Sequence, residues 1–281
     1  MKKRTKAFFV LTLFCITLFS GCQNKEELNQ ITADSSKESE SADVSTEQEI
    51  EREIERESEI NDEVIDTGMT EQEPYHYVAF GNSVTYGEVT EDIWWGDWGM
   101  AASSKENDYV HLISNELEQT LLRPVVTEVY SLKSWELASD RTSVLEELNE
   151  TLDESTDLVT IQSGENITQY QETLEIDYFD LLSFVREKAP NAQILILGEL
   201  LWPSENIETA KQTACEACEV TFVDMTQFLN DYDTFYKSSL GTEIIGADGN
   251  LHVIEDEEVA AHPNDEGMEC IARQVLSYIY R

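Results

Sequence analysis

Residues 193–197 read Gln-Ile-Leu-Ile-Leu, the clearest apolar strand signal in the chain, and Gly198 closes the run. A short apolar run bounded by turn residues is typical of a strand buried on both faces. Before it, residues 170–188 show helical spacing of apolar side chains and end ahead of Pro190, which cannot continue a helix. After it, residues 206–219 again have a helical pattern. The pattern predicts a strand between two helices.

The same alternation extends along the chain in both directions. Short apolar strands that alternate with helices indicate βαβ units and a parallel sheet covered on both faces. The predicted fold class is therefore α/β, with three layers (α/β/α) around a five-stranded parallel sheet. Further strands are predicted at 76–81, 125–130, 157–162 and 220–224, and further helices at 107–122, 135–152 and 267–280.

By composition, the 281 residues divide into a targeting segment (1–22), a tether (23–73) and a folded domain (74–281). The net charge of the chain is −40, and residues 74–281 alone carry 40 acidic and 10 basic residues. A polyanion of this kind repels nucleic-acid phosphates, so nucleic acid is not expected as a partner. The tether is rich in Glu, Ser and Asp and has no aromatic residue, which favours a disordered spacer over a marginal helix at 48–65.

The first 22 residues have the three parts of a secretory signal. A basic start (Lys2 to Lys6) precedes an apolar run over 7–19 that is too short to span a bilayer comfortably, and Ser20-Gly21-Cys22 follows. The cysteine at this place resembles the lipobox of bacterial lipoproteins, which implies lipidation of Cys22 and attachment to a membrane of the cell envelope. The alternatives are a plain secretory signal or an uncleaved anchor.

Polar side chains follow the predicted strands where an open parallel sheet collects its ligands. Asn82 and Ser83 follow the first strand, Gly164-Glu165-Asn166 follows the third, and His262 precedes the last helix. The carboxyl ends of parallel strands meet at one edge of the sheet. A hydroxyl, an amide and an imidazole at one edge are the parts of acyl transfer: nucleophile, oxyanion donor and general base.

Three blocks carry a family resemblance. Residues 80–87 (Phe-Gly-Asn-Ser-Val-Thr-Tyr-Gly), residues 164–166 (Gly-Glu-Asn) and His262-Pro263 resemble, in order and separation, the conserved blocks of the SGNH (GDSL-like) hydrolases over residues 75–281. The resemblance implies the flavodoxin-like fold of that superfamily and a serine esterase activity without a cofactor or a metal.

The resemblance also implies roles for three residues. Ser83 would be the nucleophile, and His262 the base that later protonates the leaving alcohol. Asn166 and the Ser83 backbone N–H would bind the oxyanion, and a helix after Ser83 would add its positive end.

Two positions depart from the family pattern. No glycine follows the second strand around Lys133, although the family usually takes an oxyanion N–H from a glycine there. Val259 stands three residues before His262, where the family usually has an aspartate. The acid that orients the imidazole is therefore missing, replaced by a backbone carbonyl, or supplied by another residue; the nearby acids are Asp256, Glu258 and Asp265.

Trp94, Trp95 and Trp98 follow the nucleophile block, and Trp202 follows the fourth strand. They are candidates for a pocket wall that stacks on a sugar ring or an acyl group, or else for the core. Cys215 and Cys218 form a CxxC pair on a helix without a second ligand pair for zinc, so packing is favoured, and a disulfide is an alternative that leaves Cys270 unpaired.

The sequence therefore favours an anchored serine esterase that removes acyl groups, acetyl above all, from a small-molecule or glycan ester. The two departures motivate a rival, a non-catalytic surface protein that binds carbohydrate or another ligand on the same fold. A third option is a sugar O-acyltransferase.

Overall fold

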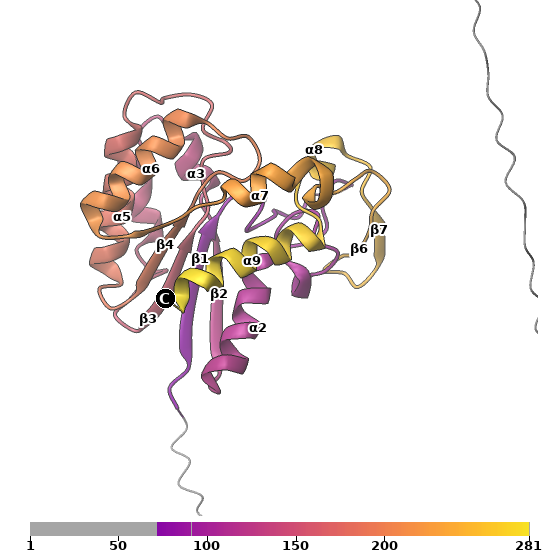
Figure 1. Ribbon diagram of the computed structural model, residues 1–281, viewed down its shortest axis with the longest axis horizontal. Coiled ribbons are helices and arrows are strands. Elements are labelled where there is room, and N and C mark those ends of the chain that lie inside the picture. Colours follow the sequence, from indigo (N-terminus) through magenta and orange to yellow (C-terminus); the bar gives the residue numbers. More distant parts are fainter. Residues whose placement is uncertain (1–71, 91, 281) are drawn as a thin grey trace, which may run out of the picture. The chain divides into compact units, whose positions relative to one another are not determined.

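A computed structural model describes residues 72–90 and 92–280, so the predicted targeting segment and nearly all of the predicted tether lie outside the described residues. Five strands form one parallel sheet in the order β2-β1-β3-β4-β5 (Figure 1). This order, with helices on both faces, confirms the predicted three-layer α/β/α fold. The strands are β1 (Tyr75–Gly81), β2 (Val125–Ser131), β3 (Thr156–Ile161), β4 (Gln193–Leu197) and β5 (Thr221–Val223).

Alternate residues of each strand point into two separate apolar cores. In β1, Tyr77 and Ala79 belong to one core, and Val78 and Phe80 belong to the other. The first core is completed by α2 (Tyr109–Leu121) and α9 (Asp265–Ile279), and the second by α5 (Leu174–Lys188) and α6 (Glu205–Cys218). Because strand side chains alternate between faces, a strand buried on both sides reads as a continuous apolar run.

The single helix predicted over 135–152 is wrong. The segment is broken because Arg141 turns inward and its Nη2 donates to the main-chain oxygen of Glu136 at 3.1 Å, while Asp140 accepts from the Ser143 N–H at 3.4 Å. Side-chain bonds of this kind compete with helix continuation. The segment consists of α3 (Lys133–Leu137), α4 (Arg141–Val144) and the 3₁₀ turn η2 (Leu145–Leu148).

The region between β5 and α9 holds short elements that the periodicity did not predict. They lie to one side of the sheet, beside the N-terminal end of α9 (Figure 1). They are α7 (Thr226–Asp231), the π-helical turn η3 (Tyr232–Tyr236), the antiparallel hairpin β6 (Glu243–Ile245) and β7 (Leu251–Val253), and α8 (Glu257–Ala260); one further 3₁₀ turn, η1 (Lys105–Asn107), precedes α2.

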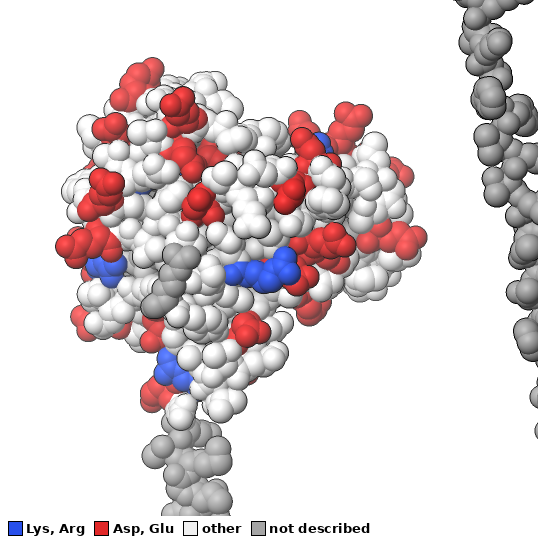
Figure 2. Space-filling view, in the orientation of Figure 1, with Lys and Arg blue, Asp and Glu red and all other residues white. Residues whose placement is uncertain are grey.

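Acidic side chains are spread over the face of the molecule in Figure 2, with few basic side chains among them. This distribution agrees with the charge balance of residues 74–281. Within residues 72–90 and 92–280, no helix combines the length and the apolar character needed to cross a membrane.

Candidate active site

The carboxyl ends of the central strands bring the candidate residues into one pocket. Ser83 lies two residues beyond the end of β1, Asn166 lies in the loop after β3, and His262 lies between α8 and α9. All three line a cavity of about 320 Å³. The other lining residues come from the loop after β1, the segment from the end of β2 to the start of α3, the loop after β4 and the segment around α8; they are Tyr86, Glu88, Thr90, Ile93, Met100, Ser131, Lys133, Trp202, Asp256, Glu258 and Val259.

Ser83 and His262 contact each other directly. The Ser83 hydroxyl donates to Nε2 of the neutral imidazole, and the two atoms are 2.7 Å apart. Ser83 is held by a tight turn in which the Asn82 carbonyl accepts from the N–H groups of Thr85 and Tyr86. The carbonyl of Ser83 accepts from the Met100 N–H at 2.8 Å. Residues 83–85 form this turn and no helix starts there, so the expected helix dipole behind the serine is absent from this loop.

The imidazole of His262 is oriented by a main-chain carbonyl. Its Nδ1 lies 2.8 Å from the Glu258 carbonyl oxygen, so the proton sits on Nδ1 and Nε2 is left as the acceptor for Ser83. His262 is only 4% exposed, and this burial lowers the pKa of the imidazole. Burial therefore keeps His262 in the neutral form that a general base requires.

None of the three acids near His262 orients its ring. Asp256 caps α8, because its Oδ1 accepts from the N–H groups of Glu258 and Val259 at 2.8 and 3.0 Å. Asp265 accepts from the Ser103 N–H and hydroxyl at 2.8 and 2.6 Å. Of the alternatives for the group that orients the imidazole, the structure therefore shows a backbone carbonyl at Nδ1.

Asn166 lines the pocket from the loop after β3. Its Nδ2 donates one hydrogen to Oε2 of Glu136 at 2.7 Å. A second hydrogen remains on the same nitrogen, and the Ser83 N–H has no hydrogen-bond partner among the described residues. These two N–H groups are the oxyanion donors that the arrangement offers.

The main-chain N–H groups around Lys133 are already bonded and do not offer a further oxyanion donor. The Lys133 N–H bonds to Ser131 Oγ at 3.3 Å, and the Leu132 N–H bonds to the Gly81 carbonyl at 2.7 Å. The Lys133 ammonium forms an exposed ion pair with Glu88 at 3.1 Å. The charge of Lys133 therefore lies at the pocket rim.

Of the four tryptophans considered for the pocket, Trp202 alone lines it, with its side chain 55% exposed. Trp94 and Trp98 are buried in the core and contact each other edge to face, so the pocket interpretation is wrong for both. Trp95 stacks on the imidazole of His252, with ring centroids 4.4 Å apart. Nε2 of His252 also lies 3.0 Å from Oδ1 of Asp248.

Sequence reasoning missed two buried glutamates behind the pocket, Glu136 and Glu165. Glu136 receives hydrogen bonds from Asn82, Gly164 and Asn166, and Glu165 receives them from Asn82, Gln162 and Leu200. Glu165 belongs to the Gly-Glu-Asn block at 164–166, yet acids are so common in this chain that neither position stands out.

Other features do not compete with this pocket. A larger cavity of about 790 Å³ lies at the N-terminal ends of α5 and α6, but its lining has no histidine or cysteine. Cys215, Cys218 and Cys270 are free thiols. Within the described residues, no group of three or more His, Cys, Asp or Glu side chains is arranged to hold a metal ion.

No family model and no curated protein matches the chain. Solved structures do match. A phospholipase A1 from Streptomyces albidoflavus is 17% identical, with 73% of this chain and 99% of that chain covered and a TM-score of 0.44. An esterase from a Pseudoalteromonas species is 12% identical (73% and 96% covered, TM-score 0.47), and a GDSL-like lipase from Bacteroides ovatus is 15% identical (74% and 99%, TM-score 0.48). These are likenesses of the fold alone.

Proposed function

We propose that this chain is a serine hydrolase that cleaves carboxylic esters through a covalent acyl-enzyme on Ser83. The observation that carries the proposal is the 2.7 Å contact between Ser83 Oγ and His262 Nε2, in a pocket that also presents the Asn166 amide. An unassisted serine hydroxyl is a weak nucleophile, and a neutral imidazole at this distance is the group that activates it.

The reaction follows from the geometry. Ser83 Oγ attacks the ester carbonyl carbon while His262 Nε2 takes the hydroxyl proton, and the Glu258 carbonyl, bonded to Nδ1–H, supports the imidazolium that forms. The Ser83 N–H and the Asn166 amide bind the oxyanion. The intermediate collapses, the alcohol leaves with the proton from Nε2, and the acyl group stays on Ser83. Water, deprotonated by His262, then releases the carboxylic acid and restores the serine.

The pocket supports a small acyl group on a neutral alcohol. A volume of about 320 Å³ is at the lower end of the range for small-molecule sites. Glu88, Asp256 and Glu258 at its rim repel anionic substrates. The exposed Trp202 offers an aromatic face of the kind that stacks on a sugar ring. An acetyl ester on a glycan combines these properties.

Attachment to the cell envelope is part of the same proposal. It is supported by the basic start, the apolar run and the Ser-Gly-Cys sequence that ends at Cys22. A Cys22→Ala variant should leave the membrane fraction if Cys22 carries the lipid, and retention of that variant in the membrane would contradict lipidation.

The test of the activity is labelling of the full chain with a fluorophosphonate, with Ser83→Ala and His262→Ala as controls. A serine esterase predicts labelling of the wild type and of neither variant. Absence of labelling in a folded wild type would favour the non-catalytic binding protein. Turnover of p-nitrophenyl acetate, with and without a sugar acceptor, then separates a hydrolase from an O-acyltransferase.

A further inference from the structure

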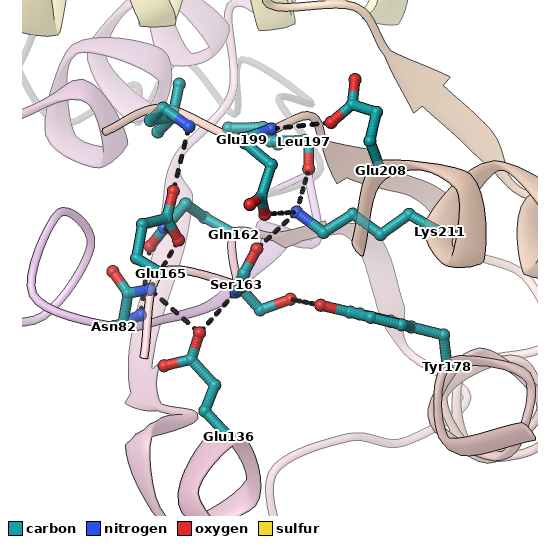
Figure 3. A network of polar contacts seen from close by, with 12 residues as sticks. Asn82, Glu136, Gln162, Ser163, Glu165, Tyr178, Leu197, Glu199, Glu208 and Lys211 are labelled. Carbon is teal, nitrogen blue, oxygen red and sulfur yellow. Dashed lines mark hydrogen bonds and ion pairs between the residues drawn. The ribbon is translucent and has the colours of Figure 1, made fainter. Parts of the chain in front are cut away.

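Glu136 is buried, with 1% of the residue exposed, and its carboxylate accepts three hydrogen bonds. Its Oε2 accepts from the Asn166 amide at 2.7 Å. Its Oε1 accepts from the Gly164 N–H at 2.5 Å and from the Asn82 amide at 3.1 Å (Figure 3). All three contacts come from N–H donors, and hydrogen bonds of this kind favour the ionised carboxylate over the protonated one.

Asn82 ties Glu136 to a second carboxylate. Its amide nitrogen donates to Glu136 and also to Glu165 Oε2 at 2.8 Å, while its Oδ1 accepts from the Val84 N–H at 3.3 Å. This last bond fixes which end of the amide faces the glutamates. Glu165 in turn accepts from Gln162 Nε2 at 2.7 Å and from the Leu200 N–H at 3.0 Å (Figure 3).

The contact with Asn166 is the one that reaches the pocket. A primary amide has two N–H bonds in one plane, so fixing one of them fixes the direction of the other. Glu136 holds one hydrogen of Asn166 and thereby leaves the second directed away from the carboxylate. Asn166 is itself only partly buried and lies on a loop, where an unbound amide would rotate.

We propose that Glu136 is a positioning residue of the active site, whose ionised carboxylate orients the Asn166 amide to receive the oxyanion. The inference rests on the proposed esterase function. A positioning role differs from a purely structural one, because Glu136 would affect the reaction rate by orienting Asn166.

The groups around Glu136 act on its ionisation in both directions. Burial and the neighbouring Glu165 carboxylate raise the pKa of Glu136, whereas the hydrogen bonds from Asn166, Gly164 and Asn82 lower it. Arg141, from α4, donates to the Glu136 main-chain oxygen at 3.1 Å, and the Tyr178 hydroxyl, from α5, lies 3.3 Å from Ser163 Oγ. Further along the same network, the buried Lys211 ammonium from α6 pairs with Glu199 at 3.0 Å (Figure 3). The three N–H groups directed at Glu136 disperse its charge, which would otherwise oppose the oxyanion.

The Glu136→Gln variant isolates the acceptor role. Glutamine has nearly the same shape, but its NH₂ group must face either Asn166 or the Gly164 and Asn82 donors, so at least one bond is lost. Loss of one oxyanion donor lowers kcat by about 10²–10³. We expect Glu136→Gln to lower kcat about 30-fold or more, with KM changed by less than about threefold, since the acyl pocket is untouched.

A double-mutant cycle with Asn166→Ala tests whether Glu136 acts through Asn166. The full chain is assayed with p-nitrophenyl acetate, and Glu147→Gln, an exposed glutamate in η2, serves as the matched control with unchanged kcat. If the inference holds, Glu136→Gln/Asn166→Ala has a kcat within about threefold of Asn166→Ala alone. Losses that multiply, or a Glu136→Gln variant as active as the wild type, would overturn it.

A second readout needs neither turnover nor a substituted glutamate. In ¹⁵N-labelled wild type, the side-chain amide signals of Asn166 and Asn82 should shift together as Glu136 takes up its proton. An Asn166 amide that ignores this titration contradicts the positioning role. If the wild type shows no Ser83-dependent turnover, the proposed function fails, while the NMR titration still decides whether Glu136 holds Asn166.

Discussion

The carbonyl oxygen of Glu258 lies 2.8 Å from Nδ1 of His262, at the place where a catalytic acid would orient the imidazole. A carbonyl fixes the tautomer as an acid does, but it carries no charge to stabilise the imidazolium. It is presented by α8, a helix of four residues whose first turn is capped by Asp256. The precision of the Ser83–His262 contact therefore depends on a short helix and its cap.

This arrangement predicts a graded response at Asp256. Asparagine also caps helices well, so Asp256→Asn should keep kcat/KM within about threefold of the wild type. Alanine removes the cap, worth about 1 kcal/mol, and Asp256→Ala should lower both kcat/KM and the melting temperature. A loss near 10⁴-fold in Asp256→Asn, the effect expected at a triad aspartate, would show that Asp256 acts as the catalytic acid.

The sequence was sufficient to predict that Ser83, Asn166 and His262 lie together, but not which group orients the imidazole of His262. Ser83, Asn166 and His262 fall at strand ends whose meeting place is dictated by a parallel sheet. A carbonyl that substitutes for an acid has no sequence signal, because every residue has one. Glu136 was equally invisible, since it lies in a segment whose expected long helix is broken at Arg141.

The pH dependence of kcat/KM should report two buried groups. Burial raises the pKa of Glu136 to about 6, and burial lowers the pKa of His262 below its ordinary value of 6.5. Both groups must be unprotonated, so activity is full above these pKa values and is lost as the pH falls through them. Below both, log kcat/KM should fall with a slope near two.

In Glu136→Gln the slope should drop to one, because His262 alone then titrates. The measurement is kcat/KM from pH 4.5 to 8 with a substrate that does not ionise in this range. A wild-type slope of one, or a slope of two that persists in Glu136→Gln, would contradict the assignment of the second proton.

Gly164 should not tolerate a side chain. Its φ is +127°, and a Cβ at this position would lie 1.9 Å from Oε1 of Glu199, which is held in place by Lys211. Strained backbone of this kind amounts to about 1–3 kcal/mol, before the clash is counted. Gly164→Ala should therefore lower the melting temperature by roughly 5 °C or more and displace Asn166, two residues on.

Gly241→Ala is the matched control for Gly164→Ala. Its φ is +87°, yet nothing lies within 4 Å of the added Cβ. It should cause a smaller fall in melting temperature and leave kcat unchanged. Equal effects of the two substitutions on kcat would show that the loop after β3 is not held by the contact with Glu199.

The fold could be predicted where a strand is buried on both faces. The prediction failed where individual side chains determine the local structure. The strand over 193–197 was predicted with the bounds it has, because both of its faces are covered and the run after Gln193 is apolar and buried. The strand over 125–131 was placed within a residue although it lies at the edge of the sheet and none of its residues is fully buried. The strands β6 and β7 of the hairpin have three residues each, which is too short for a hydrophobic period to be recognised. Trp94 and Trp98 were ambiguous for the opposite reason, since an aromatic cluster suits a core and a pocket equally.

A pair of tryptophan substitutions separates these two roles. Trp94 is fully buried between the loop after β1 and the core, and Trp94→Ala should destabilise the fold by about 3–5 kcal/mol, or roughly 10 °C in melting temperature.

Trp202 lines the pocket with its side chain more than half exposed. Trp202→Ala should leave the melting temperature within about 2 °C of the wild type. For an acetylated sugar it should raise KM about 3–10-fold, the value of one aromatic contact, while KM for p-nitrophenyl acetate, which has no sugar, stays unchanged. The comparison of the two substrates is the informative step. An equal rise in KM for both would place Trp202 against the acyl group, and no change for either would remove it from substrate binding.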